Sequence, residues 1–174
     1  SSKERLEKLL RELEEDLRRA HEEHKRLIKR LREILDEIRK RVEKLNRDLD
    51  RVLERAREEG KLDEDLRREV EDIKRRNKEN LKRLEDEVRR TEREIEELNK
   101  KLEKEVRDIA EDLKRKPVDE ELLKEVKEMI KRLRKKIKKS LDDVRRVIRE
   151  LEEHARRDLR KLEKDLKDIE DKLR

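Results

Sequence analysis

The sequence of 174 residues contains no cysteine, no aromatic residue, one glycine and one proline. Without cysteine, the chain has no disulfide, no thiolate metal site and no thiol nucleophile. Without Phe, Tyr or Trp, it lacks the side chains on which single-stranded nucleic acids stack and the large anchors of many protein interfaces. No apolar run approaches the roughly 18 residues of a membrane-spanning helix. We therefore expect neither a nucleic-acid nor a membrane partner.

Charge of both signs is abundant instead. The chain carries 58 basic and 52 acidic residues, which leaves a net charge of only +6. Charged residues make up 63% of the sequence, a fraction that by itself is typical of disordered chains. The apolar residues, however, are almost all Leu, Ile or Val, and they recur at alternating steps of four and three residues. This spacing predicts long helices that pack along a coiled-coil seam.

Two breaks divide the apolar pattern into three stripes. Gly60 suits the left-handed position just past a helix end, and Asp63 after it is a good helix N-cap. Pro117 ends the second stripe because proline cannot continue a helix, and Asp119 caps the next one. We therefore expect one domain over residues 1–174, with helices over about 2–58, 63–115 and 119–173.

Short connections force consecutive helices to run antiparallel. The predicted fold is therefore all-α, an up-down-up antiparallel three-helix bundle, or single-chain coiled coil, with one continuous core. At 1.5 Å per residue, helices of this length predict a rod about 80 Å long. An open hairpin array that awaits further helices is the competing interpretation.

A few uncharged polar residues interrupt the stripes. The loops align His24 with Asn99 and Ser140, one residue from each predicted helix. A second group comprises Asn46, Asn77, Asn80 and His154. Thr91 stands alone in its stripe and is expected to bond to a carbonyl of its own helix.

Paired buried polar groups often fix the register of coiled coils. We therefore interpret these residues as hydrogen-bond networks, an interpretation that suits His24 and Asn77 best because both lie in the seam. For the residues at the edge of a stripe, a solvated position is equally compatible with the pattern. These residues are Asn46, Asn80, Asn99 and His154.

The pair His21 and His24 lies one helical turn apart and could share a metal ion. Zinc, however, takes three or four protein ligands, and no third ligand is predicted nearby. We therefore predict no metal and no cofactor, and we interpret His21 as a solvated residue beside the seam.

The segment 131–140 carries seven basic residues in ten, a density typical of nucleic-acid or heparin patches. The same level of the predicted bundle carries acidic segments on both other helices, so we favour complementary charges that set helix pairing. A narrow aliphatic bundle is also expected to leave no pocket of the roughly 300 Å³ that small ligands occupy. The sequence therefore predicts no small-molecule substrate and no enzymatic activity.

The whole chain resembles computationally designed helical bundles, in particular de novo bundles built with buried hydrogen-bond networks. The resemblance rests on the idealised caps, the aliphatic core, the Glu-, Lys- and Arg-rich surface and the clustered Asn, His, Ser and Thr. It implies a stable scaffold with no natural activity and no required partner. One alternative is an assembly module that meets a second copy or a designed partner helix through the flanking residues Leu9, Ile28, Leu35, Leu53, Val147 and Ile148. Another is a pH-responsive bundle that uses buried His24 and His154.

Overall fold

The computed structural model describes all 174 residues, and it contains three long helices and no strand. The helices are α1 (Ser2–Glu58), α2 (Glu64–Leu113) and α3 (Glu120–Lys172). Their bounds agree with the predicted ones to within two residues, and the prediction of an all-α three-helix bundle is confirmed. None of the three helices is both long enough and apolar enough to cross a membrane.

The first loop closes α1 with a Schellman motif centred on Gly60. The amide of Lys61 donates to the carbonyl of Ala56 at 2.8 Å, and the amide of Gly60 donates to Arg57 at 3.2 Å. Gly60 has a φ of 69°, a left-handed conformation that residues with a side chain rarely adopt. This geometry explains why the single glycine of the chain stands here.

Aspartate caps begin the second and third helices, as predicted. The Asp63 carboxylate accepts a hydrogen bond from the amide of Leu66 at 2.7 Å, and Asp119 accepts one from Leu122 at 2.8 Å. Each cap satisfies an amide that has no partner within the helix. Pro117 lies in the second loop, four residues beyond the end of α2.

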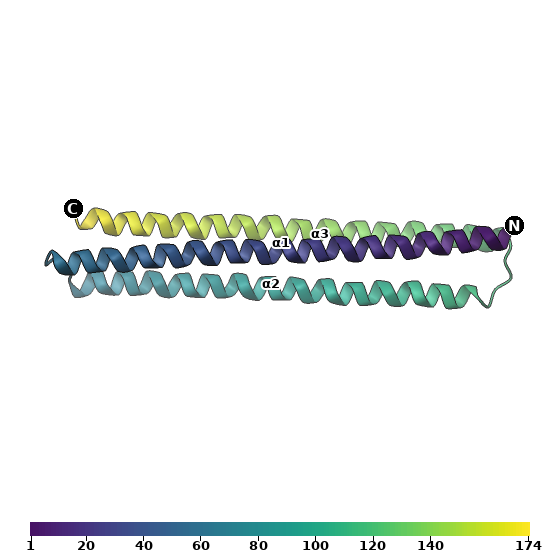
Figure 1. Cartoon of the computed structure of the whole chain (residues 1–174), viewed down its shortest axis with the longest axis horizontal. Helices are drawn as coiled ribbons and strands as arrows, with labels where there is room; N and C mark the ends of the chain where they lie inside the picture. Colours follow the sequence, from purple (N-terminus) through teal and green to yellow (C-terminus); the bar gives the residue numbers. More distant parts are fainter. The chain divides into compact units, whose positions relative to one another are not determined.

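The packing divides the chain into two compact units, each built from segments of all three helices. In the first unit, the α1 and α3 segments run in the same direction. The ion pairs Asp16–Arg134 and Glu23–Arg145 show this, since the residue numbers on both helices increase together. The α2 segment runs antiparallel to α3 (Figure 1). The first unit comprises Ser1–Lys29 and Arg90–Val147. Its main core cluster consists of Leu6, Leu13, Leu102, Val106, Leu113, Leu122, Leu123, Val126, Ile130 and Leu133.

The second unit repeats this arrangement with different residues. Its α1 and α3 segments are linked by the ion pairs Arg30–Glu152 and Arg41–Glu163. The second unit comprises Arg30–Arg89 and Ile148–Arg174. Its buried side chains come from all three stripes and include Leu31, Ile38, Leu49, Val70, Ile73, Leu84, Leu151, Leu159 and Ile169. The 3–4 spacing of the stripes thus accounts for the core of each unit.

Candidate functional site

The most deeply buried polar side chain of the chain is His24. Its imidazole is 0% exposed and stands where the α1 stripe would otherwise carry an aliphatic residue. An unpaired polar group at such a place costs free energy, so its partners decide its role. It is accompanied by Asn99 of α2 and Ser140 of α3, and we call these three residues the His24 layer.

The His24 layer contains one hydrogen bond and one looser contact. Nε2 of His24 and Oγ of Ser140 share a hydrogen bond of 3.4 Å that joins α1 to α3. Nδ1 of His24 and Oδ1 of Asn99 are both buried, and neither has a partner in good hydrogen-bonding geometry. Because the Asn99 oxygen can only accept, it suits an imidazole protonated at Nδ1, with the Ser140 hydroxyl donating to Nε2.

Burial is the main influence on the protonation of His24, and it lowers the pKa of the imidazole below its ordinary value of 6.5. Interaction with the Asn99 side chain opposes this effect and raises the pKa, as does the negative charge of Glu23. The neighbouring His21 lowers it further. The folded chain therefore holds His24 as a neutral imidazole at pH 7.

His21 lies beside the layer and does not join it. Its Nε2 is 3.6 Å from a carboxylate oxygen of Glu103 on α2, so the two form an ion pair when the imidazole is protonated. The side chain is 30% exposed, which corrects the interpretation of His21 as simply solvated. No group of three or more His, Asp or Glu side chains is arranged to hold a metal ion.

A second polar contact lies in the other unit. Asn77 of α2 is 9% exposed, and its Nδ2 donates to Oδ1 of Asn46 on α1 at 3.1 Å. Asn80 is half-buried and makes no hydrogen bond to this pair. Thr91, in the first unit, is buried and takes part in a polar interaction.

The prediction that His154 belongs to a buried group is wrong, because its side chain is exposed. His154 lies on the solvent side of α3, next to the buried Ala155, and the register between α2 and α3 also separates it from Asn80. The ion pairs Arg76–Asp165 and Glu69–Lys172 place the residue opposite Asn80 about two helical turns beyond His154. The second loop therefore offsets the two helices more than its short sequence suggests.

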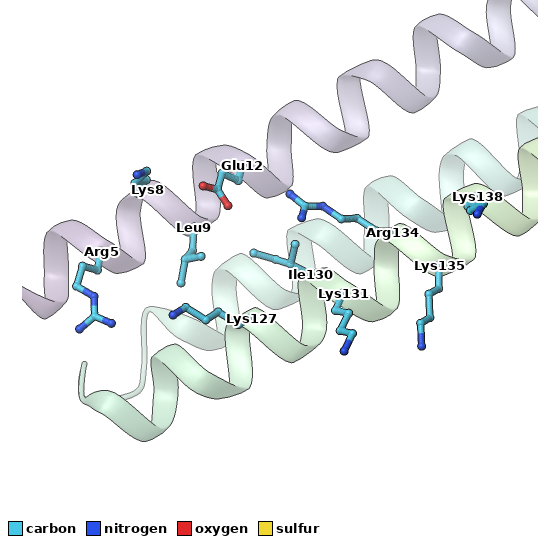
Figure 2. Close-up of a pocket in the computed structure, with 10 residues that line it drawn as sticks. All are labelled: Arg5, Lys8, Leu9, Glu12, Lys127, Ile130, Lys131, Arg134, Lys135 and Lys138. Carbon is cyan, nitrogen blue, oxygen red and sulfur yellow. The ribbon is translucent and has the colours of Figure 1, made fainter.

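The basic segment 131–140 is only partly neutralised by the neighbouring helices. Arg134 pairs with Asp16 at 2.6 Å and Lys136 pairs with Glu105 at 2.9 Å, as the complementary-charge interpretation expects. The expectation that no pocket of ligand size exists is wrong. A groove of about 710 Å³ lies between α1 and α3 of the first unit, and Figure 2 shows its lining side chains.

No protein-family model matches the chain, and neither a curated protein nor a solved structure shows significant similarity to it.

Proposed function

We propose that the chain is a structural helical scaffold of the computationally designed kind, in which buried polar residues fix the register and the pairing of the helices. The observation that carries this proposal is the complete burial of His24 together with its bond to Ser140. Replacing buried polar groups by well-packed aliphatic ones is often neutral or stabilising. A polar residue retained at such a position therefore serves specificity more than stability.

The pair Asn46–Asn77 supports the same role in the second unit. It joins α1 to α2, whereas the His24 bond joins α1 to α3. If either helix slides by one turn, its polar group faces aliphatic side chains without a partner and loses about 1–3 kcal/mol. Wrong registers are thereby disfavoured even though the aliphatic stripes alone tolerate them.

The test compares a chain carrying His24→Leu and Asn77→Leu with a control carrying Leu31→Ile and Leu84→Ile. The control alters the same two stripes but leaves the polar residues in place. Since the chain has no cysteine, spin labels can be placed without side reactions. One pair at Lys25→Cys and Lys139→Cys reports the α1–α3 register beside His24, and a second pair at Lys44→Cys and Lys78→Cys reports the α1–α2 register beside Asn77.

We expect one narrow distance distribution for the parent and the control, and a broad or divided distribution for the double-leucine chain. Its thermal stability should be somewhat lower than that of the parent, because the substitutions leave Asn46 and Ser140 without their hydrogen-bond partners. A single unchanged distance in the double-leucine chain would remove the proposed role of the polar residues.

A second candidate function, a response to pH, is favoured by the buried neutral state of His24. Because burial lowers the pKa of this histidine, protonation below pH 6.5 favours the unfolded chain. His154, the other histidine expected to take part, has an exposed side chain. The response would therefore depend on one residue in the first unit.

The assembly alternative has less apolar surface to use than the sequence suggested. Of the six flanking residues expected to meet a partner, Leu35 and Ile148 are each 7% exposed within the chain, whereas Leu9, Ile28, Leu53 and Val147 are half-buried. Leu62 is the one large hydrophobic residue with an exposed side chain. We accordingly propose a monomer of 21.7 kDa, which light scattering after size exclusion measures directly.

A further inference from the structure

The groove between α1 and α3 of the first unit has an apolar floor. Leu9 of α1 and Ile130 of α3 point toward one another at its centre (Figure 2). Ile130 is 4% exposed and Leu9 is half-buried, so both already belong to the packing of the unit. The accessible apolar surface of the floor therefore comes mainly from Leu9 and from the alkyl stems of the surrounding lysines.

The rim of the groove has a strong positive charge. Besides Leu9 and Ile130, its lining consists of seven cationic side chains and the single carboxylate of Glu12. This imbalance contrasts with the whole chain, in which basic and acidic residues are nearly equal in number. The cationic residues are Arg5, Lys8, Lys127, Lys131, Arg134, Lys135 and Lys138.

Only the two arginines of the rim are neutralised. Arg5 pairs with Glu120 at 2.7 Å and Arg134 pairs with Asp16 at 2.6 Å, so each pair links α1 to α3. The five lysines have no carboxylate within 4 Å. Their charges face solvent, and their alkyl stems extend the apolar lining. The groove is therefore a surface with unsatisfied positive charge around an apolar strip.

Four of these lysines form one row along α3. Lys127, Lys131, Lys135 and Lys138 follow steps of four, four and three residues, which places one ammonium on each successive turn. The row spans about 16 Å. A helix laid along the groove repeats with the same pitch, so its acidic side chains would meet this row turn by turn.

From this charge, spacing and floor we propose that the groove binds an acidic amphipathic α-helix of a partner molecule. The apolar side of that helix covers Leu9 and the alkyl stems of the lysines, and its Glu or Asp residues pair with the lysine row. The arrangement corresponds to helix-in-groove recognition with flanking charges that choose the partner. Binding of an acidic helix in this groove does not depend on the role of the His24 layer. The proposal of a partner helix and the proposal of register-fixing polar residues can therefore fail independently.

The test uses a fluorescein-labelled peptide of three heptads, with Leu and Ile at the core positions and Glu at both flanking positions. A second peptide carries Gln in place of each flanking Glu. Binding to the full chain is followed by fluorescence anisotropy at about 50 mM salt, where charge pairing is weakly screened.

The groove variant carries Lys127→Gln, Lys131→Gln, Lys135→Gln and Lys138→Gln. The matched control removes the same number of charges from exposed lysines of α1 outside the groove. The control substitutions are Lys25→Gln, Lys29→Gln, Lys40→Gln and Lys44→Gln. Circular dichroism checks that both variants keep the helical content of the parent.

We expect the Glu peptide to bind the parent and the control with affinities within about threefold of each other, and the groove variant at least about tenfold more weakly. The Gln peptide should also bind the parent at least about tenfold more weakly than the Glu peptide does.

Equal losses of affinity in both lysine variants would overturn the proposal, because binding would then follow net charge alone. A heparin oligosaccharide that binds through the lysine row when the Glu peptide does not would likewise overturn it. So would a parent dimer that the groove variant abolishes, since a second copy would then be the occupant.

Discussion

At the scale of single residues, Gly60 is the position where the backbone itself selects the residue type. Its φ is 69°, and no atom lies within 4 Å of the place where a Cβ would stand. A substitution there therefore adds backbone strain and no steric clash. Gly60→Ala should lower the free energy of unfolding by about 1 kcal/mol, and Gly60→Asn by less, because asparagine tolerates the left-handed region.

Urea denaturation followed by circular dichroism measures these differences, since the chain has no tryptophan for fluorescence. The control is Glu59→Ala, an exposed neighbour. Equal stabilities for the parent and Gly60→Ala would mean that the loop relaxes out of the Schellman geometry at no cost.

Asp158 of α3 is a residue whose charge opposes folding. Its partial burial raises the pKa of the carboxyl above 3.8, although His154, Arg83 and Lys161 each act to lower it. A raised pKa in the folded state means that folding is penalised once the carboxyl ionises, and the penalty disappears as the pH falls below 3.8.

Asp158→Asn should therefore raise the free energy of unfolding at pH 7 by a fraction of a kcal/mol and have little effect near pH 3. The exposed Asp108→Asn serves as the control and should change stability at neither pH. A destabilised Asp158→Asn chain at pH 7 would show that the favourable charges around Asp158 outweigh its desolvation.

At the scale of helix pairs, the contact between Asn46 and Asn77 is expected to show energetic coupling. Since Nδ2 of Asn77 donates to Oδ1 of Asn46, removing either side chain leaves the other without this partner. In a double-mutant cycle with Asn46→Ala and Asn77→Ala, the coupling energy should be about 0.5–1.5 kcal/mol in favour of the pair. The same cycle with Asn80→Ala in place of Asn77→Ala should give a coupling near zero, and equal couplings would contradict the observed pairing.

The elements themselves followed closely from the sequence, because each of their ends depends on local chemistry. Gly60, Asp63 and Asp119 occupy the cap positions that their side chains predict. The register between helices was less accessible, since it depends on the path of the loops. The His24–Ser140 contact was found because it tolerates a small error in alignment, whereas His154 was misplaced by the offset between α2 and α3.

At the scale of the whole molecule, three-four spacing specifies three helices and their buried stripes but says little about the outer surface. The groove lined by Lys127 and Lys131 was missed for this reason. The groove is bounded largely by the alkyl stems of long cationic side chains, whose conformations residue spacing does not show. The basic segment 131–140 was the feature of the sequence that could have indicated this groove. Which of its charges are neutralised, however, depends on the register between the helices, and the sequence did not show that register.

The stability of the whole chain should fall between pH 7.5 and pH 5, in part through His24. The folded-state pKa of this histidine lies below 6.5, so its contribution is complete above pH 6.5 and declines as the pH falls toward the folded-state pKa. Each tenfold difference in proton affinity between the folded and the unfolded state corresponds to about 1.4 kcal/mol.

Glu23 and His21 act on the same imidazole and remain unchanged in a His24→Gln variant. The measurement is the free energy of unfolding of the parent and of His24→Gln at both pH values. All other titratable groups are the same in the two proteins, so the difference between their changes in stability isolates His24. We expect the parent to lose more stability than the variant, and equal losses would show that His24 is as easily protonated in the folded chain as in the unfolded one.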